Sequence, residues 1–308
     1  MPAGRASQAA GFALAATAAV LWGFAGVVAK AALQGALDSG TLLVLRLAVS
    51  AVIVGLWAAL RRPGALRVPA GGWPMMVALG LAIVSLHTMY YATIQATSVG
   101  TAVFLQYLSP TLIVLFGWAT YRQARERWSA LSVVTALTGS WLLVATAGGL
   151  VLSTRALATG LGAAVSLAAQ TVLLEQVGRR VHPLGVVFWS LTIAGIASLI
   201  VGNPGGIATT AWTLSLTAAA AYMIVGATVV PMLLLIAAVG RIGAAKAGVV
   251  STLEPVVAAL AASPFLGERM TPGQSAGAIL ILVAIWFVYR APAPRSAARV
   301  QSVDILQT

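Results

Sequence analysis

Two long stretches without a charged residue limit what this chain can fold into. No Asp, Glu, Lys or Arg occurs from Trp73 to Tyr121, or from Val181 to Gly240. A membrane-spanning helix needs about 20 mainly apolar residues, so each stretch can hold two if the chain turns at the polar segments 95–101 and 202–206. Soluble domains carry about 25% charged residues, whereas only 8% of these 308 residues are charged and 60% are hydrophobic. We therefore expect an all-α integral membrane protein.

Ten segments fit the length and composition of transmembrane helices. Asp38 and Ser39 are candidate caps for the second of them. The first segment follows a single arginine and has no distinct cleavage region, which indicates a membrane helix rather than a signal peptide. The expected spans are 11–33, 41–60, two within 73–121, 128–146, 156–174, two within 181–240, 243–265 and 271–289.

The distribution of positive charge predicts the orientation. With ten spans and both termini in the cytoplasm, 14 of the 18 Lys and Arg residues lie on the cytoplasmic side, three lie outside, and Arg46 falls within the second span. This agrees with the positive-inside rule and predicts a multi-pass protein of the bacterial inner (plasma) membrane. The net charge of +12 sits in short loops rather than on one face, so no nucleic-acid partner is expected.

An internal repeat with an offset of 145 residues relates the two halves of the chain. Pro110 matches Pro255, Leu108 matches Leu253, and the string AAV at 18–20 recurs at 163–165. We expect one five-helix repeat in residues 1–150 and a second in residues 151–308, which also include a short cytoplasmic tail. Because five is odd, the second copy enters the membrane from the opposite face. Inverted repeats of this kind are typical of secondary transporters, whose substrate site lies near the midplane between the repeats.

The second half carries a longer motif. The string STLEPVVAALAASPFLGERMTPGQSAGAILIL and its weaker echo QYLSPTLIVLFGW resemble the EamA family of the drug/metabolite transporter superfamily. The resemblance extends over residues 11–290. It implies export of small metabolites, and within the family the chain most resembles bacterial exporters of amino acids, including the aromatic type. The motif residues are Leu253, Glu254, Pro255, Leu266, Gly267, Glu268 and Gly277.

Glu254 is the one acid deep in an apolar span. Acids inside the membrane are rare and face a cavity or a partner, so Glu254 either binds a substrate amine or a proton, or ties down a helix broken at Pro255. Pro110 is the corresponding break in the first half. Lys246 is expected to snorkel toward the cytoplasm, or alternatively to meet a substrate carboxylate near the inner gate. Arg46 is expected to snorkel or to form a structural pair rather than to bind substrate, and no base is expected deep in any span.

The third span presents polar groups on one face. His87, Tyr91 and Gln95 follow i, i+4, i+8 spacing, which places them on one side of a helix. A lone buried histidine is usually a satisfied core residue, but the phenol and the amide favour a wet cavity. A pH-sensing or proton-handling role for His87 is a further alternative. The residues expected to bind substrate or line the cavity are Trp22, His87, Tyr90, Tyr91, Gln95, Phe104, Gln106, Tyr107, Ser166, Gln170, Tyr222, Ser251 and Glu254.

Enzymatic motifs are missing from the sequence. It has no cysteine and no HExxH, GxSxG or Walker A string, so we expect no enzyme, metal or cofactor. The expected function is export of neutral or aromatic amino acids, or of related metabolites, by alternating access, with proton coupling left open. A nucleotide-sugar or phosphate-ester carrier is disfavoured because phosphate needs several basic groups at the midplane. An intramembrane enzyme relying on Glu254 or Ser251, or a receptor, is the alternative from a different class.

Overall fold

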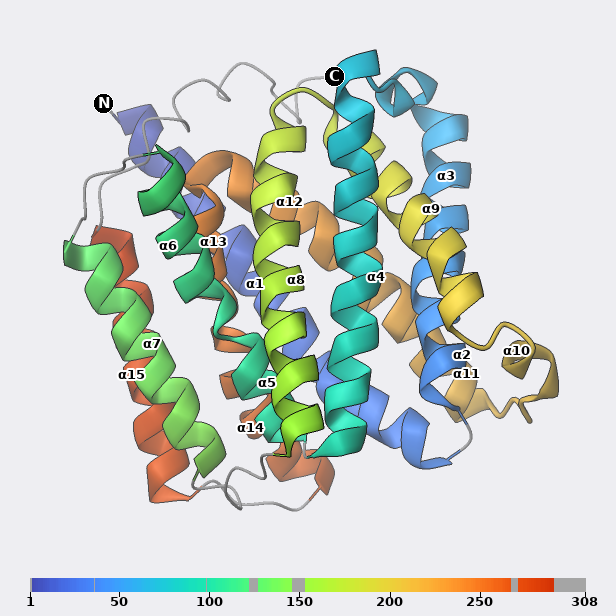
Figure 1. Ribbon diagram of the computed structural model, residues 1–308. Helices are drawn as coiled ribbons and strands as arrows, with labels where there is room; N and C mark the ends of the chain where they lie inside the picture. Colours follow the sequence, from blue (N-terminus) through green and yellow to red (C-terminus); the bar gives the residue numbers. More distant parts are fainter. Residues whose placement is uncertain are drawn as a thin grey trace.

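The computed structural model describes residues 2–35, 37–97, 99–121, 127–145, 153–266 and 271–290. These residues form a bundle of long helices that run between two ends (Figure 1). The first half contains α1 (Pro2–Gly35), α2 (Ser39–Val44), η1 (Leu45–Val49), α3 (Ser50–Arg61), η2 (Pro63–Leu66), η3 (Ala70–Gly72), α4 (Trp73–Ala96), α5 (Val99–Gln106), α6 (Ser109–Tyr121) and α7 (Arg127–Ala145). The second half contains α8 (Thr154–Gly178), α9 (Pro183–Val201), α10 (Gly206–Thr209), α11 (Leu214–Ala221), η4 (Tyr222–Val229), α12 (Val230–Ile242), α13 (Ala244–Ser251), α14 (Leu253–Leu266) and α15 (Pro272–Arg290).

The helices account for the ten expected spans. Within the described residues, nine helices are long and apolar enough to cross a membrane, and a shorter apolar helix, Thr101–Gly117, supplies the fourth span. The start of α1 and the end of α15 lie at the same end of the bundle, because the rings of Phe12 and Tyr289 meet edge to face with centroids 5.0 Å apart. A chain that crosses the membrane ten times must begin and end on the same side.

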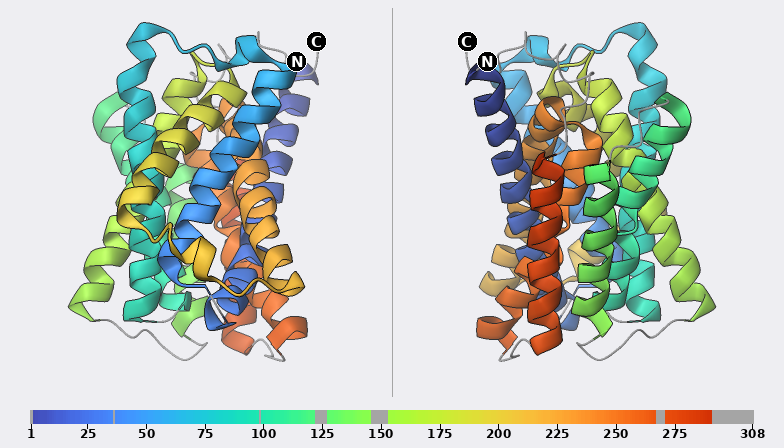
Figure 2. Two further views of the ribbon diagram at one scale, coloured as in Figure 1. Left: turned by 90° about the vertical axis from the view of Figure 1, so that its right-hand side faces the viewer. Right: turned by 90° about the vertical axis from the view of Figure 1, so that its left-hand side faces the viewer.

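The two halves interlock rather than standing apart. The largest helix contacts join α4 to α8 and α9, α1 to α12 and α14, and α7 to α15. The right-hand view of Figure 2 shows α15 (red) alongside α7 (green). Glycine permits this last approach, since a Cβ placed on Gly139 would lie 2.7 Å from the Gly277 carbonyl oxygen. Close backbone contact at small residues is typical of helix packing in lipid.

Two spans are broken at equivalent positions. The α5–α6 span breaks at Tyr107–Leu108, and the α13–α14 span breaks at Thr252. Each break lies about one helical turn before the proline from which it was predicted, Pro110 or Pro255. Proline lacks an amide donor and clashes with the carbonyl of residue i−4, so the helix yields upstream of the proline. Proline itself is accommodated in the first turn of the next helix, where a missing donor costs nothing.

Two further spans contain π-helical segments. In the second span, η1 separates α2 from α3; in the eighth, η4 separates α11 from α12. The two segments pack against each other across the boundary between the halves. Short π segments inside α-helices are found frequently at functional sites.

A hydrogen-bonded group, which we term the Asp38 clasp, joins the halves at one end of the bundle. The Asp38 carboxylate caps α2, as its sequence position predicts, by accepting from the amides of Gly40 and Thr41 at 2.9 and 3.0 Å. It also accepts from the Thr41 hydroxyl and, at 3.1 Å, from the Asn203 side-chain amide. Burial alone would raise the pKa of Asp38, but these hydrogen bonds outweigh it and hold the pKa below its ordinary 3.8.

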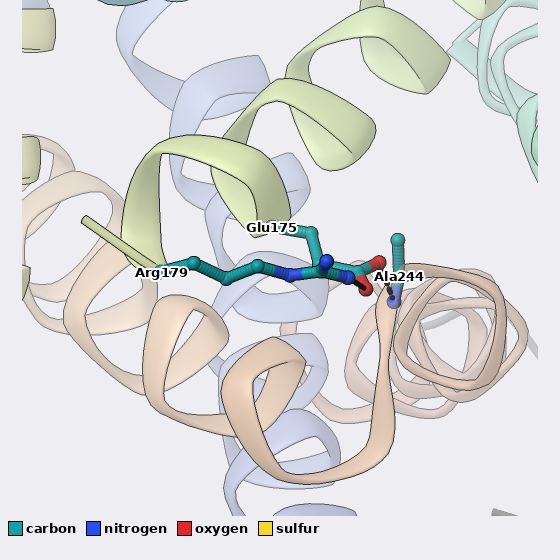
Figure 3. Close-up of polar contacts among 3 residues, drawn as sticks. All are labelled: Glu175, Arg179 and Ala244. Carbon is teal, nitrogen blue, oxygen red and sulfur yellow. Dashed lines mark hydrogen bonds and ion pairs between the residues drawn. The ribbon is translucent and has the colours of Figure 1, made fainter. Parts of the chain in front are cut away.

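At the opposite end, Glu175 joins α8 to the start of α13 (Figure 3). Its carboxylate accepts from the Ala244 amide at 2.9 Å and forms an ion pair with Arg179 at 2.6 Å. The chain enters α13 through Gly243, whose φ of 81° favours glycine. An acid at a helix N-terminus satisfies a free amide and complements the helix dipole.

Candidate functional site

One cavity of about 720 Å³ lies between the two halves of the bundle. The first half contributes residues from α1, η1, α4, α5, α6 and α7, and the second from α8, η4, α12, α13, α14 and α15. A volume of several hundred cubic ångströms suits a small molecule. The expected residues that the structure places around it are Trp22, His87, Tyr90, Tyr91, Gln106, Tyr107, Gln170, Ser251, Glu254 and Pro255.

The two broken spans meet in this cavity. The Tyr107 hydroxyl donates to the Glu254 carboxylate at 2.5 Å, which joins the break in α5–α6 to the first turn of α14. The position of Glu254 at a helix N-terminus favours a negative charge. Ser109 occupies the matching place in the first repeat and also lines the cavity. The site is therefore asymmetric, with an acid in one repeat and a hydroxyl in the other.

The polar face of α4 reaches the cavity through His87, Tyr90 and Tyr91. His87 Nδ1 lies 2.8 Å from the Ile83 carbonyl oxygen. Since a carbonyl only accepts, Nδ1 carries a proton in this contact, and Nε2 is an acceptor when the ring is neutral. The His87 and Tyr91 rings pack at 6.5 Å between centroids, as the i, i+4 spacing predicts.

Two buried polar atoms on the cavity wall have no hydrogen-bond partner among the residues that the structure describes. They are the Tyr91 hydroxyl and the Gln170 side-chain carbonyl oxygen Oε1. Buried polar groups are normally paired, so each exception needs an explanation. Their position on the cavity wall suits contact with a polar ligand or water.

Other expected site residues lie outside the cavity. Gln95, one turn beyond Tyr91, sits near the end of α4 and donates to the Ser39 hydroxyl at 2.8 Å. The Ser166 hydroxyl pairs with that of Ser85 at 2.9 Å, and the Tyr222 hydroxyl donates to the Leu21 carbonyl at 2.7 Å. These three side chains are used in packing between helices. The two remaining residues, Phe104 and Pro110, also do not line the cavity.

Arg46 and Lys246 do not extend to the surface of the bundle, as snorkelling would require; both are buried within it. Arg46 is only 8% exposed and lines the cavity. Lys246 is 5% exposed, which contradicts snorkelling. The reason is packing: α13 is surrounded by α1, α6, α7, α8, α12 and α15, so a lysine in its first turn is enclosed by neighbouring helices. Arg46 is held by η4, through Ala227 and Thr228.

One feature of the sequence indicated that the guanidinium of Arg46 would be buried. Arg46 is the only basic residue inside the second expected span, and ionisable groups in spans face the interior of a bundle. No metal-binding cluster occurs among the described residues. The predicted repeat boundary at residue 150, the motif residues Gly267 and Glu268, and the tail after 290 lie outside them.

Comparison with known proteins identifies the family. The model of the "EamA-like transporter family" matches residues 9–145 and again residues 154–290. The uncharacterized inner membrane transporter YicL of Salmonella typhimurium is 29% identical over 275 residues, covering 87% of this chain and 91% of the relative. The threonine/homoserine exporter RhtA of the same species is 29% identical over 208 residues, covering 67% of this chain and 66% of the relative.

The fold is also found among solved structures. One crystal structure superposes with a TM-score of 0.75 at 20% sequence identity, covering 91% of this chain and 96% of that one. This likeness concerns the fold alone. The two family matches and the helical architecture confirm the predicted all-α fold with two inverted repeats. The chain is a multi-pass membrane transporter and belongs to the EamA-like transporter family.

Proposed function

We propose that this transporter exports neutral amino acids, or small zwitterions closely related to them. The observation that carries the proposal is the Glu254–Tyr107 pair in the cavity between the two halves. A carboxylate in a low-dielectric cavity attracts an ammonium group strongly. Tyr90 and Trp22 add aromatic surface to the wall, which suits apolar and aromatic substrate side chains. The likeness to a relative named threonine/homoserine exporter supports the same substrate class.

Transport would proceed by alternating access. The two halves form one site, and both spans that carry the Tyr107–Glu254 contact are interrupted there. Interrupted helices at the midplane are typical of secondary transporters, in which one repeat rocks against the other. On the charge distribution, the end that carries Arg62 and Arg179 faces the cytoplasm, and the Asp38 clasp faces outward. The repeats are those expected from the sequence, 1–150 and 151–308.

A carrier of phosphate esters remains disfavoured, but on different grounds. From the sequence, no base was expected at the site, but Arg46 lines the cavity. The structure supplies another ground: Glu254 lines the same cavity, so a dianionic phosphate would face a like charge as well as a single guanidinium. Like charges at close range cost free energy in a low dielectric. A zwitterion satisfies both groups.

The test is uptake into proteoliposomes containing the purified protein. Radiolabelled neutral amino acids, including threonine and phenylalanine, are measured beside glucose 6-phosphate, with and without a pH gradient. We expect saturable uptake of at least one neutral amino acid above the rate of protein-free liposomes, and none of the sugar phosphate. A faster rate with the gradient would assign proton coupling. Amino-acid uptake at the protein-free rate, together with sugar-phosphate uptake, would contradict the proposal.

A further inference from the structure

Arg46 is a buried cation that has no carboxylate partner in the part of the chain that the structure describes. It is 8% exposed, and the one ion pair among the described residues joins Arg179 to Glu175. Moving a guanidinium from water into the protein interior costs roughly several kcal/mol of solvation free energy unless other groups replace the lost water contacts. Arg46 also lines the cavity. Glu254 lines the same cavity but forms no ion pair with Arg46. A buried guanidinium that faces a ligand cavity with no carboxylate in contact with it indicates that a ligand supplies that contact.

Hydrogen bonds to the protein hold one edge of the Arg46 guanidinium, and the other edge is left to face the cavity. Nε donates to the Thr228 hydroxyl at 3.0 Å, and Nη2 donates to the Ala227 carbonyl at 2.9 Å. Both acceptors belong to η4, and Arg46 belongs to η1. An arginine carries five N–H donors, so Nη1 and the second hydrogen of Nη2 stay available. These two nitrogens form the end of the guanidinium, which matches a carboxylate in a two-point contact.

We infer that Arg46 binds the carboxylate of the substrate. The inference rests on the proposed function and deepens it: the cavity would select molecules with a free carboxylate as well as an ammonium group. Amino-acid amides and decarboxylated amines keep the group that Glu254 recognises but lack the one that Arg46 recognises. The substrates are then α-amino acids rather than amines in general. Arg46, through its two links to η4, is held in place before the substrate arrives.

The size of the effect follows from the kind of hydrogen bond. A bond to a charged group contributes about 1.5–3 kcal/mol, which corresponds to about a 10- to 100-fold difference in affinity. Wild-type protein should therefore bind threonine and phenylalanine about 10- to 100-fold more tightly than their amides, by competition against labelled amino acid in proteoliposomes. This ratio, rather than the rate itself, is the quantity to compare between variants.

Arg46→Met should fold and should lose the preference for the free carboxylate. The acceptors that Arg46 leaves behind keep other bonds: the Ala227 carbonyl still accepts from the Trp22 indole at 3.0 Å, and the Thr228 hydroxyl still donates to Met223 at 2.8 Å. An apolar side chain of similar size also avoids the cost of removing a charge from water. The amide should bind Arg46→Met as well as it binds wild type, and the amino acid should bind no better than the amide.

Ser50→Ala is the matched control. The Ser50 hydroxyl donates to the Ile224 carbonyl at 3.1 Å, so it is another buried link from the first half to η4, but it does not line the cavity. We expect a small loss of thermal stability and an unchanged amino-acid-to-amide ratio. A ratio that collapses in Ser50→Ala as it does in Arg46→Met would show that loosening η4 is enough, and would overturn the role given to Arg46.

Arg46→Lys supplies the second test. Lysine keeps the charge but loses the planar fork, so the ratio should fall to a value between those of wild type and Arg46→Met. A wild-type ratio in folded Arg46→Met overturns the inference; if that variant does not fold, a wild-type ratio in Arg46→Lys does so. Wild-type protein that takes up no amino acid at all would instead refute the proposed function, which separates the two failures.

Discussion

The hydrogen bond between Tyr107 and Glu254 yields a prediction on stability. Tyr107→Phe removes the hydroxyl that donates to Glu254 at 2.5 Å and keeps the ring, which is 2% exposed. A hydrogen bond to a charged group contributes about 1.5–3 kcal/mol, and a buried acceptor left without its donor pays its desolvation cost. We therefore expect Tyr107→Phe to lose about 1.5–3 kcal/mol of unfolding free energy, with little change in packing.

Tyr91→Phe is the control from the same cavity. Tyr91 is also buried, at 4% exposure, but its hydroxyl has no hydrogen-bond partner in the described part of the chain. Removing an unpaired buried hydroxyl should leave the stability of the ligand-free protein unchanged or raise it. Thermal denaturation of both variants and wild type in one detergent, followed by tryptophan fluorescence, makes the comparison. Equal melting temperatures for Tyr107→Phe and Tyr91→Phe would refute the contribution assigned to the Tyr107–Glu254 bond.

Three further predictions concern packing, orientation and charge. Gly139→Ala should cost about 1–3 kcal/mol and lower the melting temperature, because the new methyl would meet the Gly277 backbone; wild-type stability would show that α7 and α15 separate easily. In this cysteine-free chain, Gly64→Cys should resist an impermeant thiol reagent in whole cells and Gly205→Cys should react; the reverse pattern would invert the orientation. Asp38→Asn should lower the melting temperature at pH 7, because a carboxylate whose pKa is lowered by folding stabilises in full above its ordinary pKa of 3.8. The difference from wild type should vanish only as the pH falls through the lowered value, and a constant difference down to pH ~2 would exclude the charge as its cause.

Much of the fold could be predicted because a membrane restricts the choices. Apolar length defined the spans, and the turns at 95–101 and 202–206 lie where the long charge-free runs are divided. The two breaks were predicted from Pro110 and Pro255, since proline disturbs any helix by the same mechanism. The exact break, one turn upstream, depends on backbone geometry that the sequence pattern does not specify.

The positions of the charged side chains were harder to predict, because the burial of a side chain depends on the helices packed around it. Depth along a straight helix suggested that Arg46 and Lys246 reach the membrane surface. In the structure the segment around Arg46, η1, is π-helical, and α13, which carries Lys246, lies among six other helices besides α14. A π segment changes which face of a helix meets its neighbours, and no periodicity in the sequence predicted the π segment η1.

The cavity face of α4 shows the same limit. The i, i+4 spacing correctly placed His87 and Tyr91 together. Gln95 continues that face, but it lies near the helix end, where the nearest polar group belongs to α2. Spacing gives the direction of a side chain, whereas the extent of a cavity depends on where the other helices end.

The most direct test of the proposed function compares Glu254→Gln with His87→Gln in the same transport assay. Glutamine can still accept a hydrogen bond from Tyr107, so the tie between the broken helices is kept while the negative charge is lost. Both residues line the cavity, and both substitutions retain a polar side chain. If Glu254 binds the substrate ammonium, Glu254→Gln should reduce amino-acid uptake by about tenfold or more in folded protein, and His87→Gln should retain most of it. Uptake by Glu254→Gln at the wild-type rate, with an unchanged dependence on pH, would assign Glu254 to structure alone and contradict the account.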